Sequence, residues 1–204
     1  MYVTKIEPVT KAKYKVFLEE QFAFVLYKGE LSRYMIQEGA EISQETLKEI
    51  KKEVLEKRAK LRAMHLLERM DRTETQLRTK LQQDLYPEDI IEIAMQYVRS
   101  FGYIGDRGYA KRFVESRQGS KSKLEIKRAL LQKGIAKEIV YEVLEEYYDD
   151  QAESAAIRKL LEKKRFSPET ATEAEKQKMY GYLLQKGFRY EDVRQVIQVS
   201  SWNA

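Results

Sequence analysis

The sequence contains no cysteine, three prolines, nine glycines and a single histidine in 204 residues. Without cysteine the chain forms no disulfide, thiolate metal site or cysteine nucleophile, which fits the reducing cytoplasm, where we expect the protein to be located. The lone histidine, His65, excludes a site built from several imidazoles. No apolar run reaches the roughly 18 residues that cross a bilayer, and the N-terminus lacks a signal-peptide pattern, so we expect no membrane association.

Motifs for phosphate binding and nucleophilic catalysis are also missing. The chain contains no GxxxxGK[ST], GxGxxG or GxSxG pattern. Gly102, Gly105 and Gly108 recur at intervals of three, but we interpret them as a tight link between two helical segments rather than a nucleotide loop. We therefore predict no catalytic residue, metal or cofactor, and a protein that is not an enzyme.

The composition that remains favours a strongly solvated, helix-rich fold. Hydrophobic residues make up 43% of the chain and charged residues 35%, with little glycine or proline to interrupt helices. The formal net charge is +5, which suits an anionic partner.

The first third of the chain has two different patterns. Thr4 to Val9, Lys13 to Leu18 and Phe22 to Tyr27 are β-branched and aromatic with partial alternation, which predicts strands in a small N-terminal β element over residues 1–42, with a turn at residues 28–30. From Ser43 to Met70 apolar residues recur at helical spacing. We expect one long helix, or two joined near residues 56–60, with residues 43–57 as a connecting helix.

Beyond this point the sequence repeats itself three times. Residues 80–90, 130–140 and 183–193 align, with Leu81 matched to Leu131 and Leu184. The fold class we predict is mainly α, with three tandem three-helix repeats over residues 58–104, 105–150 and 151–204. Since each unit alone buries little, we expect the repeats to stack into an elongated or curved array.

Hydroxyl residues mark the beginning of one helix in each repeat. Thr73, Ser122 and Thr172 are each followed three residues later by Gln or Glu, the capping-box spacing that satisfies free amides at a helix start. Gly134 and Gly187 stand where these helices should end, because glycine tolerates the left-handed cap conformation, and Asp84 takes the corresponding place in the first repeat. Each repeat is thus predicted to consist of helix, helix and helix.

The most basic long stretch lies in the second repeat. It holds nine basic residues and two acidic ones. The basic residues are Arg107, Lys111, Arg112, Arg117, Lys121, Lys123, Lys127, Arg128 and Lys133. If Lys111 or Arg112 faces the same side as Lys127 or Arg128, these cations contact phosphates or acidic protein; otherwise the stretch is an ordinary solvated surface. The aromatic residues among them, such as Tyr109 and Phe113, have the spacing of a helix core, which favours packing over base stacking.

The same region resembles the signature of the RecX family of regulatory proteins. The run from Phe101 to Arg117 resembles its Gly-aromatic-aliphatic-x-Asp turn and aromatic-rich helix, and Ile126 to Ile135 resembles its helix ending in Lys-Gly-Ile. The residues that match are Gly102, Tyr103, Asp106, Tyr109, Phe113, Arg117, Lys133, Gly134 and Ile135. The resemblance extends from Arg58 to the C-terminus; Gly105 departs from it, because family members often have Asp or Asn there.

The resemblance implies a modulator that lies in the groove of the RecA filament on DNA. Such a protein inhibits RecA recombinase, ATPase and co-protease activity in DNA repair, recombination and the SOS response, with the filament as partner and DNA contacted directly or through it. We predict a monomer in which the nine cations are the candidate contacts, Asp106 is a turn or cap residue, and the other motif residues mainly encode packing. The alternative is a helical repeat protein whose main activity is sequence-independent DNA binding.

Overall fold

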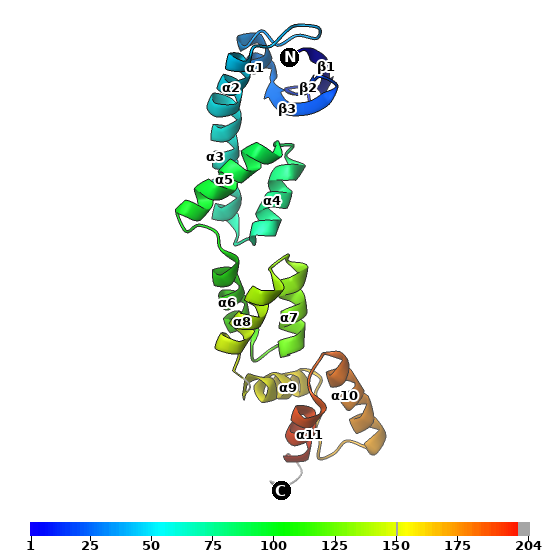
Figure 1. The fold of residues 1–204 in the computed structure, drawn as a ribbon. Coiled ribbons are helices and arrows are strands. Elements are labelled where there is room, and N and C mark those ends of the chain that lie inside the picture. The colour runs from blue at the N-terminus through cyan, green and yellow to red at the C-terminus, as the bar shows by residue number, and fades with distance from the viewer. Residues whose placement is uncertain (150, 200–204) are drawn as a thin grey trace. The chain divides into compact units, whose positions relative to one another are not determined.

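A computed structural model describes residues 1–149 and 151–199 and confirms the mainly helical class with a small N-terminal sheet. The chain divides into two compact bodies, one ending at Ile104 and the next beginning at Gly105. The first body holds the sheet and one three-helix unit, and the second holds two further units (Figure 1).

The sheet is antiparallel with the strand order β1-β2-β3. Its strands are β1 (Val3–Pro8), β2 (Lys13–Leu18) and β3 (Gln21–Tyr27), each within one residue of the predicted bounds. One face buries Val16 and Leu18 of β2 and Phe24 and Leu26 of β3 in the core of the first body.

The turn predicted after the third strand is wrong. Helix α1 (Lys28–Arg33) begins directly at this position. The carboxylate of Glu30 accepts a hydrogen bond from the backbone N–H of Tyr27 at 2.7 Å, so the residue expected to close a turn instead caps a helix.

The connecting segment is helical throughout but changes pitch. It runs as α2 (Gln44–Glu49), the π-helix η1 (Ile50–Glu56) and α3 (Lys57–Arg69). The buried residues are spaced five positions apart from Ile50 to Leu55, and then four positions apart to Ala59 and to Ala63. Since a π-turn adds one residue to the α-helical repeat, this step keeps all four side chains on the same face.

Three three-helix units follow, each with apolar residues of its own in the core, as predicted. The first combines α3 with α4 (Glu74–Gln83) and α5 (Glu88–Ser100). The second unit consists of α6 (Asp106–Arg117), α7 (Lys123–Gln132) and α8 (Lys137–Tyr147), and the third of α9 (Gln151–Lys163), α10 (Glu173–Gln185) and α11 (Tyr190–Val199). The exact boundaries of the repeats stay predictions, and residue 150 and the C-terminal residues 200–204 lie outside the described residues.

The predicted helix caps are confirmed, with one difference. Thr73, Ser122 and Thr172 are the N-caps of α4, α7 and α10, and each hydroxyl accepts a hydrogen bond from the N–H three residues on. The return bond from the side chain to the cap N–H forms after Thr73 and Thr172. Glu125 instead lies near Lys121 and Lys186, at 3.4 and 3.6 Å.

The predicted alignment of the first repeat is wrong by one residue. Leu81, Leu130 and Leu183 each lie three residues before a helix C-cap and are fully buried. Leu131 and Leu184, which the sequence alignment matched to Leu81, are 36% and 41% exposed. The leucine pairs in the second and third units allow either register, and only burial distinguishes them.

The helix ends show the same shift. Gly134 and Gly187 adopt φ of 81° and 87° as predicted, but the equivalent residue of the first unit is Leu85 with φ of 64°, and not Asp84. A leucine in this conformation carries backbone strain that glycine avoids. Asp84 is the C-cap residue itself.

We predict that Gly187→Ala destabilises the second body more than Gly119→Ala. Both glycines have a positive φ, so each alanine costs about 1 kcal/mol of backbone strain. At Gly187 the added Cβ would also lie 2.9 Å from Cβ of Leu124, whereas no atom of the described residues lies within 4 Å of a Cβ added at Gly119. This overpacking adds roughly 1–3 kcal/mol. Urea unfolding followed by circular dichroism measures both losses, and equal losses would contradict the close packing of α7 against the residue that follows α10.

Candidate functional site

The nine candidate cations lie in the second unit, where seven of them divide among three neighbourhoods and Arg112 and Arg128 lie outside these, so they do not form one basic surface. The first borders α8. The second surrounds two aromatic rings of α6. The third lies where α7 meets the third unit.

Arg107 and Lys111 belong to the neighbourhood beside α8. The Arg107 guanidinium donates to Glu142 at 2.8 Å and to Glu146. Lys111 lies 4.5 Å from the centre of the Tyr147 ring and 3.9 Å from a carboxylate oxygen of Glu115. These acidic neighbours largely neutralise this edge of the unit.

Tyr109, Phe113, Arg117 and Lys133 form what we call the aromatic–basic cluster, between α6 and the end of α7. The two rings stack with centroids 6.2 Å apart. Lys133 Nζ lies 5.7 and 5.6 Å from the two ring centres, and the Arg117 guanidinium lies 5.8 Å from that of Phe113. Cation–π attraction holds these charges beside half-buried rings, and Arg117 remains exposed. The cluster joins four of the motif residues quoted above.

Arg112 and Arg128 are exposed on the outer surfaces of α6 and α7. Arg128 lies four residues after Leu124 and three before Leu131, each 36% exposed, so the three lie on the same side of α7. Within the part of the chain that the structure describes, Arg128 forms no ion pair.

Lys123 and Lys127 lie beside a cavity of about 300 Å³ between the second and third units. Lys127 Nζ donates to the hydroxyl of Tyr141 and lies 4.0 Å from its ring centre, which holds the pKa of Tyr141 below its ordinary value. Lys123 Nζ lies 5.4 Å from the ring centre of Tyr148. Leu124 and Gly187 line the same cavity.

Glu153 of α9 is a buried carboxylate at this cavity, and the sequence analysis did not find it. It is 6% exposed. One oxygen accepts from the backbone N–H of Lys123 at 2.9 Å and from the hydroxyl of Tyr148 at 3.2 Å, and the other has no hydrogen-bond partner among the described residues. Burial, together with the nearby carboxyl of Asp192, raises the pKa of Glu153. Spacing gives no signal for such a residue, because its partners come from other helices.

Ser122 and Lys121 complete this junction between the units. Ser122 is fully buried, and its hydroxyl donates to the backbone carbonyl of Lys186 at 2.6 Å. Lys121 pairs with Glu125 at 3.4 Å, and Lys186 lies 3.6 Å from the same carboxylate. The residue predicted as a helix cap thus also links the end of α10 to the start of α7.

A single phosphate-binding track would require Lys111 and Lys127 to face the same side, and these two lysines do not meet that requirement. They contact different tyrosines of α8, Tyr147 and Tyr141, and the exposed residues between these rings include Glu142, Glu145 and Glu146. A nucleic acid following both lysines would meet this acidic surface. Of the candidate cations, Arg117 and Arg128 are better placed to meet an anionic partner.

The remaining motif residues occupy turns and core positions. Gly102 has φ of 68°, and the ring of Tyr103 stacks on that of Phe101 with centroids 5.6 Å apart. Asp106 is the first residue of α6, after the N-cap Gly105, so its carboxylate lies at the positive end of the helix. Ile135 is 3% exposed and packs in the core of the second unit.

Neither a metal-binding group nor a membrane-spanning helix occurs among the described residues. They contain no group of three or more His, Cys, Asp or Glu side chains arranged to hold a metal ion. None of the helices described is long and apolar enough to cross a membrane. His65 is half exposed, with Nδ1 3.8 Å from a carboxylate oxygen of Glu68.

The fold and the basic second unit define a class of protein built from three consecutive three-helix units after a small sheet. Family models for the first, second and third three-helix domains of RecX match residues 59–97, 106–144 and 151–197. The chain belongs to the RecX family of regulatory proteins.

Relatives and solved structures agree with this assignment. A protein named regulatory protein RecX from Caldanaerobacter subterraneus is 34% identical over 202 residues, covering 98% of this chain and all of the relative. Another from Clostridium beijerinckii is 32% identical over 96% of this chain and 94% of the relative. A crystal structure of regulatory protein RecX has the same fold, with a TM-score of 0.61, 24% identity and coverage of 97% of this chain and 98% of the other.

We predict that Glu153→Gln stabilises the protein at neutral pH. The raised pKa keeps the Glu153 carboxyl protonated in the folded protein at pH values where the same carboxyl has lost its proton in the unfolded chain. The folded state therefore binds more protons above pH 4.5. The free energy of unfolding of the parent therefore falls as the pH rises through that window. Glutamine keeps an acceptor for Lys123 N–H and adds a donor for Asp192, so we expect a gain of about 1 kcal/mol at pH 7 that vanishes below pH ~4.

Chemical denaturation of the parent and the variant at a series of pH values measures this difference. Glu162→Gln, a change of the same chemistry at an exposed position of α9, is the matched control and should leave the pH profile unchanged. A Glu153→Gln protein that is less stable than the parent across the whole range would show that the ionised carboxylate holds the junction together.

Proposed function

We propose that this protein binds the RecA filament on DNA and negatively modulates RecA recombinase, ATPase and co-protease activity in recombination and repair. Membership of a family of regulatory proteins supports a regulatory role. The observation on which the contact surface depends is the aromatic–basic cluster on α6 and α7. Acting by binding, the protein requires no catalytic residue or cofactor of its own, and we propose that it is a cytoplasmic monomer and not an enzyme.

The cluster, together with Arg128 on the outer surface of α7, suits a protein surface of opposite charge. Arg117 lies against an aromatic ring, and Arg128 forms no ion pair within the described residues. Neither charge is satisfied by an acidic neighbour in the way that Arg107 is by Glu142 and Glu146. Tyrosine and arginine, which both occur here, are also among the residues most often found at energetically important interface positions. We therefore propose that RecA contacts this protein at α6 and α7.

We predict that adding the protein to RecA filaments slows their DNA-dependent ATP hydrolysis. The rate should fall with increasing protein and reach a plateau when the filament is saturated, because a regulator bound along the filament hinders turnover of the subunits it contacts. A coupled ATPase assay on preformed filaments measures this. Unchanged hydrolysis at concentrations where sedimentation shows the protein bound to filaments would overturn the proposed negative modulation.

We predict that the double variant Arg117→Glu, Arg128→Glu inhibits about tenfold less effectively than the parent, because reversed charges repel an acidic partner and about 1.4 kcal/mol corresponds to a factor of ten. The matched control is Lys159→Glu, Lys178→Glu, which makes the same change in net charge at exposed positions of the third unit. Inhibition titrations with helicity checked by circular dichroism compare the two. An equal loss in both would show that overall charge, and not this surface, determines binding.

The alternative function is direct, sequence-independent binding of DNA, which the net charge of +5 favours. Its affinity for bare DNA would fall steeply with salt through counterion release. Comparing bare DNA with RecA filaments at the same salt concentration separates the two functions, since a filament regulator binds the filament more tightly.

A further inference from the structure

The sheet of the first body has a second face, opposite the one that packs in the core. Strand register places alternate residues on it, opposite the face that buries Val16, Leu18, Phe24 and Leu26. We call this the outer face of the sheet. It carries Lys5 and Glu7 from β1, Lys13, Lys15 and Phe17 from β2, and Phe22, Val25 and Tyr27 from β3.

Aromatic rings on this face are accessible to solvent. Phe22 is 40% exposed and Tyr27 37%, and Phe17 is partly exposed. Phe17 and Phe22 are cross-strand partners whose rings meet edge to face with centroids 6.0 Å apart. Rings at such positions cost free energy in water unless something covers them, and they present flat surfaces for another planar group.

Cations surround these rings. Lys5 Nζ lies 5.9 Å from the ring centre of Phe17, and Lys13 Nζ lies 5.4 Å from that of Tyr27. Lys15 lies between them in the register, and Lys11 is exposed in the turn before β2. Among the residues described, Lys11, Lys13 and Lys15 form no ion pair.

Acidic residues limit this surface rather than cancel it. Glu7 is the acidic residue of the outer face, and it pairs with Lys5. Glu19 and Glu20 lie in the turn between β2 and β3, at the opposite end of the hairpin from Lys11 and Lys13. On the outer face itself the positive charge is therefore concentrated towards the β1–β2 turn, while Arg58 and Arg62 beyond the end of β3 are paired with Glu30 and Asp84.

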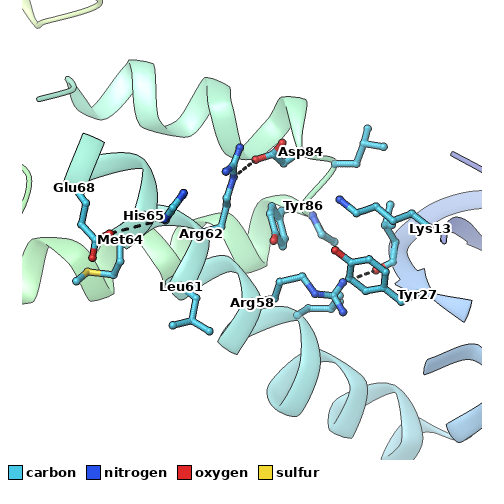
Figure 2. A pocket seen from close by; sticks show the side chains of 14 residues that line it. Lys13, Tyr27, Arg58, Leu61, Arg62, Met64, His65, Glu68, Asp84 and Tyr86 are labelled. Atoms are coloured by element: carbon cyan, nitrogen blue, oxygen red, sulfur yellow. Dashed lines mark hydrogen bonds and ion pairs between the residues drawn. The ribbon is translucent and has the colours of Figure 1, made fainter. Parts of the chain in front are cut away.

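At that end the outer face continues into a groove against α3. Figure 2 shows Tyr27 beside Lys13 and Arg58, with Arg62, His65 and Tyr86 farther along the same cavity. The Arg58 guanidinium lies 4.6 Å from the ring centre of Tyr27, and the cavity measures about 670 Å³. Burial raises the pKa of Tyr86 to about 12, so its hydroxyl stays protonated and able to donate a hydrogen bond.

We propose that the outer face of the sheet and this groove bind a single-stranded nucleic acid. Bases would stack on Phe22 and on the neighbouring rings of Phe17 and Tyr27, while the phosphates would lie along Lys11, Lys13 and Lys15. This combination of aromatic platforms and a basic track binds single strands with little sequence preference, because every base has a stacking face. A duplex hides those faces in its own stack.

The experiment is a fluorescence anisotropy titration of the full chain with a labelled oligo(dT). Since stacking contributes about 1–3 kcal/mol per base, Phe22→Ala should weaken binding about fivefold or more, and Phe22→Tyr should restore it. Lys13→Gln combined with Lys15→Gln should weaken binding and lower the salt slope by roughly 1.4, at about 0.7 for each lost phosphate contact. The matched control is Met35→Ala, which removes a 79% exposed apolar side chain from the same body.

A second measurement locates the contact, because the second unit is basic as well. Ultraviolet crosslinking to an oligonucleotide with halogenated pyrimidines, followed by mass spectrometry, should give adducts on the peptide spanning residues 16–27. Adducts confined to residues 105–133, or Phe22→Ala binding as tightly as Met35→Ala, would overturn the proposal. So would equal competition by poly-glutamate, which would identify an acidic protein segment as the occupant. None of these outcomes depends on inhibition of the RecA ATPase.

Discussion

The polar ends of short helices are the constraint on which this structure depends. A unit of three short helices exposes many free amides and carbonyls, and each must find a partner close to a small core. Thr73 and Ser122 are completely buried, and each hydroxyl accepts a hydrogen bond from a backbone N–H in the first turn of the helix that it caps. The Ser122 hydroxyl also donates a hydrogen bond to the backbone carbonyl of Lys186 at the end of α10, which links the second unit to the third. Each of the three units meets this requirement in the same way, with a hydroxyl residue as the N-cap of its middle helix.

Surface charge follows from this architecture. Helix α8 packs against both other helices of its unit and presents glutamates to solvent, so cations on either side of it are drawn into local pairs, as Arg107 is. Some basic residues elsewhere in the unit lie beside rings, as Arg117 does beside Phe113. Two cations in the same basic stretch therefore differ in what they offer a partner, and net charge alone does not distinguish them.

Much of the fold could be predicted from the sequence, because strands, caps and repeats are encoded by neighbours along the chain. Local signals located Thr73, Ser122 and Thr172 at helix starts and Gly134 and Gly187 at helix ends. They failed where two registers were equally apolar, as at Leu130 and Leu131, and where Lys28 begins a helix that its capping glutamate stabilises. The candidate site was harder, because burial of Glu153 and the separation of Lys111 from Lys127 depend on contacts between helices distant in sequence.

The π-helix η1 links the two halves of the first body by a fixed rotation. One residue more than an α-helical turn keeps Ile50 and Leu55 on the side that faces the core. Losing that residue would turn everything before it by about 100° relative to α3. The strands would then present a different face to Arg58, and Tyr27 would no longer meet it. A single residue thus sets the angle of the sheet relative to the helices. Insertions or deletions between Ile50 and Glu56 should therefore be far less tolerated than in the loops.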